Sequence, residues 1–298
     1  MALPLRAEVV SFPARRSRGR ALLAAMRPRQ WSKNLLLFAG LVFAAKIGDL
    51  LRWVEACTAF VAYCAASSAA YVVNDVADAD RDRAHPLKRL RPAARGELTR
   101  RAVCLLAGTL AVLAFGLVAP LGLPSVALLA GFLALQGAYT CALKHLVLVD
   151  VVAIAGLFVI RAAAGTVAAD VRISPWLLLV TGLLALFLAL AKRRSELAVA
   201  ASARPVLDGY SPPLVDQLIS VSVAATIAAY SVYTFTAHDP ALMATIPFVV
   251  FGLFRYLLLV HRDDLGEEPE NVLLSDRPLV LAVLGWAVTA AVTLALTS

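Results

Sequence analysis

The sequence predicts an all-α protein that spans a membrane as one bundle of nine helices. Its composition, the length of its apolar segments and its uneven distribution of basic residues support this prediction. Of the 298 residues, 61% are hydrophobic and 16% are charged, and the mean hydropathy is +0.79. A soluble domain is about half apolar and about a quarter charged. We therefore expect a mobile basic cytoplasmic tail, residues 1–26, followed by a single transmembrane domain, residues 27–298.

Nine apolar segments approach the roughly 20 residues that cross the hydrocarbon core of a bilayer. They lie near residues 34–52, 54–73, 102–120, 124–143, 147–169, 175–191, 214–236, 241–260 and 278–297. The first is the weakest, because its apolar part ends at Ala45 and charged residues follow. We expect it to tilt or to break near Gly48. A secretory signal peptide is the alternative, but 33 residues precede this segment and a clear cleavage site is missing.

Basic residues gather on one side of the predicted bundle. With nine spans, the N-terminal tail and the loops after spans 2, 4, 6 and 8 lie on the same side, and they hold 24 of the 28 lysines and arginines. Cytoplasmic segments of membrane proteins carry such an excess. The sequence therefore predicts an integral protein of the inner (cell) membrane, with its N-terminus in the cytoplasm and its C-terminus outside.

An acidic segment, NDVADADRD, follows the second span directly on the cytoplasmic side. Asn74, Asp78 and Asp82 are spaced four residues apart. Asp75 precedes Asp78 by three residues, so a continuing helix places all four side chains on one face, and Asp80 faces away. Carboxylates stacked in this way repel each other unless a cation lies between them, and Mg²⁺ prefers oxygen ligands. We predict that Asp75, Asp78 and Asp82 bind Mg²⁺, with a solvated loop of mixed charge as the alternative.

Basic residues follow at once, in the loop HPLKRLRPAARGEL. An acidic, metal-binding face beside an arginine-rich loop suits a phosphate or diphosphate held as its metal salt, because arginine holds phosphate oxygens through paired hydrogen bonds. The candidate phosphate contacts in this loop are His85, Lys88, Arg89 and Arg91. For the basic run alone, the alternative is an anchor to anionic lipid headgroups. Such an anchor does not require the carboxylates.

These two segments together resemble the first signature motif of the UbiA superfamily of intramembrane prenyltransferases. The matching residues are Asn74, Asp75, Asp78 and Asp82 of N-D-x-x-D-x-x-x-D, and Arg91, Pro92 and Gly96 of the R-P-x-x-x-G that closes the loop. RPRQWSKNLLLFA (27–39) and YTCALKHLVLVDVVAIAGLFVIRAAAG (139–165) further resemble one branch, the decaprenyl-phosphate phosphoribosyltransferases. The likeness covers nearly the whole chain from residue 27. It implies a nine-helix UbiA-like bundle with a central cavity that faces the cytoplasm.

The chain departs from the superfamily at one place. UbiA proteins typically carry a second motif, D-x-x-x-D, after span 6, where this chain reads KRRSEL with Glu196 as the nearby acid. A prenyl diphosphate donor would be held by Mg²⁺ at both motifs. Lys192 and Arg193 instead suggest direct cationic contact with an additional phosphate, such as the one on C5 of phosphoribosyl pyrophosphate.

Further polar residues are candidate substrate contacts. Lys33, where the tail meets the first span, is either a phosphate contact or a snorkelling lysine. Tyr139, Lys144 and Asp150 match a pattern of the branch, although Asp150 alone would also serve as a helix cap or ion-pair partner. Arg161 lies about 16 Å along the fifth span. Charges at that depth face a bundle interior or a cavity, which leaves open whether Arg161 binds a phosphate or pairs with an acid.

The resemblance implies a Mg²⁺-dependent pentosyltransferase. Such an enzyme moves 5-phosphoribosyl from phosphoribosyl pyrophosphate to polyprenyl (decaprenyl) phosphate, releases diphosphate and feeds the synthesis of cell-wall arabinan (arabinogalactan) precursors. Its partners are these two substrates and the lipid bilayer; no nucleic acid is expected, and a homo-oligomer is compatible with the family.

Two alternatives remain open. A UbiA-type prenyltransferase, which uses a prenyl diphosphate donor and an aromatic or other acceptor, would normally have the second aspartate motif. An anion transporter would spread charges across the bilayer or show an internal repeat. In this sequence the polar residues collect on one side, which argues against transport.

Overall fold

The computed structural model describes residues 15–43, 48–84, 88–198, 205–236, 240–263, 272 and 275–297, which form helices and turns without a strand. The α-helices are α1 (Arg18–Met26), α2 (Ala39–Phe43), α3 (Leu50–Ala77), α4 (Ala79–Ala84), α5 (Arg100–Val118), α6 (Leu123–Cys141), α7 (Val149–Ala168), α8 (Pro175–Ala198), α9 (Pro212–Thr236), α10 (Ile246–Asp263) and α12 (Arg277–Thr297). The 3₁₀ helices are η1 (Pro28–Phe38), η2 (Lys88–Leu90), η3 (Ala119–Leu121), η4 (Leu143–His145), η5 (Pro205–Gly209) and η6 (Pro240–Thr245). The predicted all-α class is confirmed.

Seven helical segments of the described chain are long and apolar enough to cross a membrane, so the structure supports an integral membrane protein. They are Leu50–Ala77, Arg100–Leu121, Leu123–Cys141, Val149–Ala168, Pro175–Ala198, Pro212–Thr236 and Pro240–Arg262. These seven fall on the second to eighth predicted segments. The ninth predicted segment falls on α12, whose apolar stretch, Arg277–Thr293, is shorter.

The first predicted segment, 34–52, is not one helix. Its first part belongs to η1 and α2, and its last residues belong to the next helix, α3. Asp49 causes this division, because its carboxylate accepts hydrogen bonds from the backbone N–H groups of Leu51 (3.0 Å) and Arg52 (3.4 Å). A carboxylate in this position caps a new helix. The charged residues at the end of the predicted span therefore start α3, just beyond Gly48.

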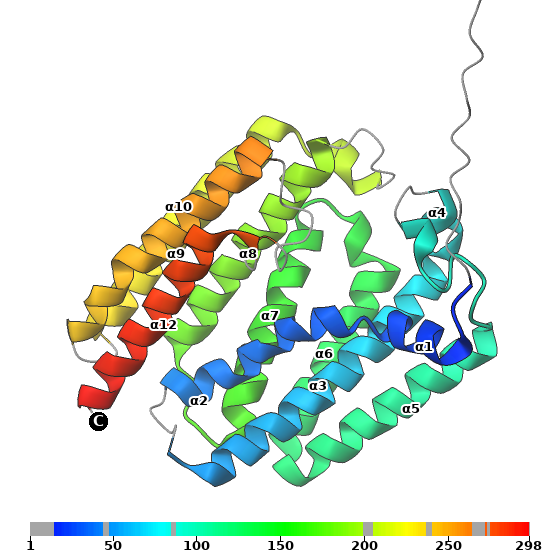
Figure 1. Cartoon of the computed structure of the whole chain (residues 1–298), viewed down its shortest axis with the longest axis horizontal. Coiled ribbons are helices and arrows are strands. Elements are labelled where there is room, and N and C mark those ends of the chain that lie inside the picture. The colour runs from blue at the N-terminus through cyan, green and yellow to red at the C-terminus, as the bar shows by residue number, and fades with distance from the viewer. Residues whose placement is uncertain are drawn as a thin grey trace, which may run out of the picture.

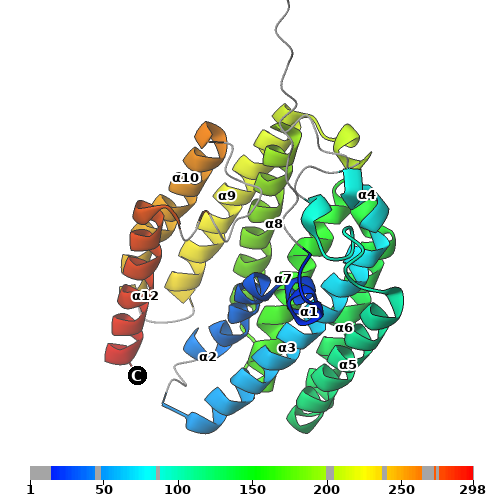
Figure 2. The same cartoon turned by 45° about the vertical axis from the view of Figure 1, so that its right-hand side comes forward.

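Helix α7 joins two apolar cores. One core contains buried residues of η1, α3, α5, α6 and α7, and the other contains buried residues of α7, α8, α9, α10 and α12. Figures 1 and 2 show the same division, with α3, α5 and α6 on one side of α7 and α9, α10 and α12 on the other. Side chains from both halves can therefore meet around α7.

The N-terminal helices pack against α3 and α7. Figure 1 shows α1, η1 and α2 lying across α3 and α7, and η1 packs against both. Ala21 and Ala25 of α1 are buried, so the last nine residues of the predicted tail form a packed helix. A Cβ atom on Gly165 of α7 would lie 1.9 Å from the carbonyl oxygen of Leu37. Only glycine permits this approach of η1 to α7.

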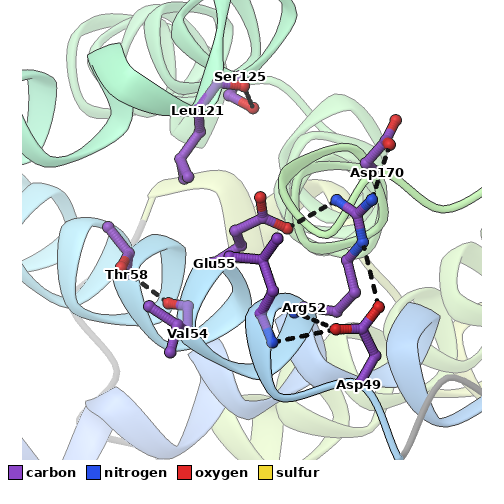
Figure 3. Close-up of polar contacts among 9 residues, drawn as sticks. Asp49, Arg52, Val54, Glu55, Thr58, Leu121, Ser125 and Asp170 are labelled. Atoms are coloured by element: carbon purple, nitrogen blue, oxygen red, sulfur yellow. Dashed lines mark hydrogen bonds and ion pairs between the residues drawn. The ribbon is translucent and has the colours of Figure 1, made fainter.

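An ion-pair cluster ties the start of α3 to the end of α7. Arg52 lies 2.9 Å from Glu55, 3.1 Å from Asp170 and 3.8 Å from Asp49, as Figure 3 shows. Asp170 belongs to the turn between α7 and α8 and has a positive φ of 50°. This cluster lies at the end of α3 opposite the predicted aspartate site, where it holds two neighbouring helices in register.

Candidate active site

The aspartate segment bends at Asp78. Helix α3 continues past the predicted membrane boundary to Ala77, and Asp78 then leaves helical geometry (φ −97°, ψ 2°) before α4 begins. Asp75 and Asp82 are 2% and 5% exposed. The side chain of Asp80 is 91% exposed and pairs with Arg83 at 2.6 Å. Asp80 therefore faces away from the other carboxylates, as its spacing predicts.

Arg91 bridges two of the buried carboxylates. Its Nη1 atom lies 2.8 Å from Oδ2 of Asp82 and 3.3 Å from Oδ1 of Asp75. Arg27 also pairs with Asp75, and its guanidinium lies 5.1 Å from the centre of the Tyr71 ring. In the sequence, Arg27 stands out only as one of the basic residues on the predicted cytoplasmic side. Nothing in the sequence indicates this contact, because 48 residues separate the two partners.

Asp78 belongs to a second, adjoining set of contacts. Lys144 Nζ lies 2.8 Å from its Oδ1 atom, and the amide of Asn74 donates to its Oδ2 atom over 3.1 Å. Lys144 lies in η4, between α6 and α7. The structure thus brings together the first signature motif and a residue of the Tyr139–Asp150 pattern.

A buried network connects α7, α8 and the turn before α9. Nε of Arg193 lies 2.7 Å from Asp150, and the same guanidinium pairs with Glu196 and donates a long hydrogen bond (3.5 Å) to the Tyr139 hydroxyl. Arg193 and Asp150 are 1% and 0% exposed. The hydroxyl of Tyr210 donates to Asp150 over 2.6 Å. Burial, and the hydrogen bond to this carboxylate, raise the pKa of Tyr210.

This network differs from the expected role of the KRRSEL segment. Arg193 points to carboxylates instead of an open site, and Arg194 pairs with Asp216 at 2.9 Å. The physical reason is that a charge this deeply buried requires an opposite charge, which Asp150 supplies from another helix. Lys192 is half-buried, and its predicted contact with a phosphate stays a prediction.

Arg161 and Lys33 lie apart from these pairs. Arg161 is 4% exposed, and its Nε donates to Asn34 Oδ1 over 2.8 Å. No carboxylate of the described chain lies within ion-pair distance of it. Lys33 precedes Asn34 in η1 and is half-buried.

The basic loop contributes residues to two sides of the site. Arg91 faces the carboxylates, whereas Arg89 lines a cavity of about 350 Å³ together with Arg83 and Arg95. Lys88 begins η2. His85 lies outside the described residues.

The carboxylates suit a divalent ion by their chemistry. No three acidic, histidine or cysteine side chains of the described chain lie close enough to hold an ion jointly. The guanidinium of Arg91 nevertheless lies between Asp75 and Asp82, so these two carboxylates already share one cation. Their oxygen atoms are the ligands that Mg²⁺ prefers. By the chemistry of their donor atoms, Asp75 and Asp82 therefore fit Mg²⁺, whereas Asp78 contacts Lys144 and Asn74.

Comparison with known proteins shows the family to which this sequence is similar. The sequence profile of the UbiA prenyltransferase family matches residues 35–275. A decaprenyl-phosphate phosphoribosyltransferase of Mycolicibacterium smegmatis is 35% identical over 286 residues, 89% of this chain and 89% of the relative. The protein of the same name from Mycobacterium tuberculosis is 35% identical over 285 residues, 90% of this chain and 92% of the relative.

Solved structures of UbiA homologues from Archaeoglobus fulgidus share the fold. The one bound to DMAPP and Mg²⁺ has a TM-score of 0.70 at 17% sequence identity, over 92% of this chain and 96% of that chain. The one bound to GPP and Mg²⁺ has a TM-score of 0.69 at 18% identity, over 92% and 97%. At this level of identity the likeness concerns the fold alone.

Proposed function

The chain belongs to the UbiA prenyltransferase family, and we propose that it transfers 5-phosphoribosyl from phosphoribosyl pyrophosphate to polyprenyl (decaprenyl) phosphate, with release of diphosphate. The observation that carries this proposal is the 35% identity, over 89% of the chain, to a relative that bears this name. The missing second aspartate motif supports it, because a prenyl diphosphate donor would normally be held by Mg²⁺ at that motif as well, and this chain has KRRSEL in its place. The product is a lipid-linked pentose phosphate of the kind that cell-wall arabinan synthesis requires.

The proposed topology keeps nine crossings. Seven come from the long apolar helices, and η1–α2 and α12 supply the first and the last. The aspartate end of the bundle then faces the cytoplasm together with the N-terminus, in agreement with the excess of basic residues on that side. The central cavity opens on the same side for the soluble donor, and the C-terminus lies outside.

The reaction forms one bond and breaks one bond. An oxygen of the polyprenyl phosphate attacks C1 of the ribose from the face opposite the diphosphate. The bond between C1 and the diphosphate oxygen breaks, its electron pair leaves with the diphosphate, and C1 is inverted. Because the attacking oxygen is already anionic, the protein need not supply a strong general base. Its contribution is to position the two substrates and to neutralise charge.

The carboxylates and the cations of the site have separate roles in positioning the substrates and neutralising their charge. Asp75, Asp78 and Asp82 would hold Mg²⁺, which when bound neutralises charge on the departing diphosphate. The donor's phosphates are assigned to Lys33, Asn74, His85, Lys88, Arg89, Arg91, Tyr139, Lys144 and Lys192. Asp150, Arg193 and Glu196 fix α7 against α8 and so set the position of Tyr139.

A detergent-micelle assay tests the proposal. Purified protein receives radiolabelled phosphoribosyl pyrophosphate, decaprenyl phosphate and Mg²⁺, and organic-extractable label is counted with and without EDTA. We expect label in the lipid phase that EDTA abolishes, and a loss of at least about 100-fold in the Asp78→Asn variant. Asp80→Asn is the matched control, because Asp80 lies two residues away and faces solvent. Turnover of a prenyl diphosphate without phosphoribosyl transfer would instead make the chain an ordinary prenyltransferase.

A further inference from the structure

Arg161 places a positive charge inside the bundle without an opposite charge beside it. It lies in the middle of α7, and its two hydrogen bonds go to neutral acceptors, Oδ1 of Asn34 (2.8 Å) and the carbonyl oxygen of Leu157 (3.1 Å). The rings of Phe132 and Phe158 flank its guanidinium at 4.7 and 5.3 Å. A buried arginine is costly in this setting unless an anion compensates its charge. Arg193, for comparison, has two carboxylate partners.

Two hydroxyl groups on α3 share this region and lack hydrogen-bond partners within the described chain. They belong to Tyr63 and Ser67, which are 1% and 3% exposed. The two residues are four apart, so they lie on one face of α3. The Tyr63 ring contacts the Phe132 ring (5.1 Å between centroids) that also lies under Arg161. Buried hydroxyls are normally satisfied, so two unsatisfied ones beside an uncompensated cation point to an absent acceptor.

This region is connected to the aspartate site along α3. Ser67, Tyr71 and Asp75 follow one another at four-residue steps, so they lie on one face of the helix. Arg27 contacts both Tyr71 and Asp75. Eight residues of helix separate Ser67 from Asp75, a distance of about 12 Å along the axis. An anion near Arg161 would therefore lie deeper in the bundle than a diphosphate held at the aspartates.

We propose that Arg161, Tyr63 and Ser67 bind the phosphate group of the lipid acceptor. A guanidinium and two hydroxyls supply the donors that a phosphate monoester requires, and this depth within the bundle suits a phosphate attached to a membrane-embedded chain. Asn34 is a positioning residue, since its Oδ1 accepts from Arg161 while its amide contacts Sγ of Cys64 at 3.3 Å. The assignment to the acceptor rests on the proposed function; the anion site itself does not.

The 5-phosphate of the donor has the same chemistry, so kinetic measurements must separate the two sources. We expect Arg161→Gln to raise the KM for decaprenyl phosphate at least about tenfold and to leave the KM for phosphoribosyl pyrophosphate within about twofold. Tyr63→Phe and Ser67→Ala should each raise the KM for decaprenyl phosphate by a smaller factor. Thr58→Ala is the matched control, because the Thr58 hydroxyl lies on the same helix and donates to the carbonyl oxygen of Val54 over 2.8 Å. A rise in the donor's KM instead would overturn the assignment to the acceptor.

A binding measurement without turnover keeps the test independent of the reaction. Decaprenyl phosphate should raise the thermal midpoint of the wild-type protein more than decaprenol, which lacks the phosphate. Arg161→Gln should remove that difference, whereas Thr58→Ala should preserve it. If transfer from phosphoribosyl pyrophosphate is never detected but this difference disappears in Arg161→Gln, the proposed function fails and the anion site stands. An unchanged difference in Arg161→Gln, whatever its effect on stability, would overturn the site.

Discussion

Lys144 Nζ lies 2.8 Å from Oδ1 of Asp78, although 66 residues separate them in the chain. The contact joins the connection between α6 and α7 to the end of α3, on the face that carries the proposed donor site. Both side chains are mostly buried, with 15% and 21% exposed. The pair therefore couples a cation that we propose for the donor's phosphate to a carboxylate that we propose for Mg²⁺.

Lys144→Met should lower kcat/KM for phosphoribosyl pyrophosphate about 10- to 100-fold, because it removes a cation that would neutralise the diphosphate. Lys144→Arg should restore part of the loss. Steady-state assays at varied donor concentration check this result. His145→Ala is the control, since this neighbour is exposed. An equal loss in both variants would show that η4 was disturbed as a whole.

Arg193→Met should destabilise the protein by about 3–5 kcal/mol, because it leaves the buried carboxylates of Asp150 and Glu196 without their cation. Arg194→Met removes a partly exposed pair with Asp216 and should cost about 0–1 kcal/mol. Thermal unfolding in detergent compares the two variants. Equal midpoints, with a selective rise in the donor's KM for Arg193→Met, would return Arg193 to a direct phosphate contact.

Gly165→Ala should disrupt the packing of η1 on α7. The added Cβ atom would lie 1.9 Å from the carbonyl oxygen of Leu37, so the backbone must shift, at a cost of about 1–3 kcal/mol or more. Gly108→Ala in α5 meets no atom within 4 Å and should be neutral or stabilising by about 0.5–1 kcal/mol. Thermal midpoints measured in the same detergent test this contrast. A stable Gly165→Ala protein would contradict the close approach.

Tyr210→Phe should lower the free energy of unfolding by about 1.5–3 kcal/mol. The hydroxyl that it removes donates to the Asp150 carboxylate and accepts from the Leu148 N–H group over 2.8 Å. Since the pKa of Tyr210 is raised from its ordinary value of 10.0, its protonated form is the one that folding favours. The difference in the free energy of unfolding between the wild-type protein and the variant should be constant below about pH 10 and shrink as the pH rises further. Unfolding of both proteins at several pH values between about 7 and 11 measures this difference. An advantage that changes between pH 7 and 9 would contradict this assignment.

The sequence predicted which polar side chains share a helix face better than it predicted their partners. The four-residue spacing of Asn74, Asp78 and Asp82 correctly indicated which acidic side chains turn inward and that Asp80 turns outward. It did not indicate that Arg27 pairs with Asp75. Periodicity reports the face of a single helix, whereas a contact between distant segments depends on how helices cross.

The chain composition and local patterns by themselves determined the membrane class, the helical fold, most of the spans and the acidic face at the end of α3. These follow from hydropathy and helical periodicity, which are properties of neighbouring residues. Only the tertiary structure decided that Arg193 is matched by Asp150 and that Arg161 lacks a carboxylate partner within the described chain. Each of these outcomes depends on which groups meet inside the bundle, because the cost of burying a charge is set by its neighbours in space.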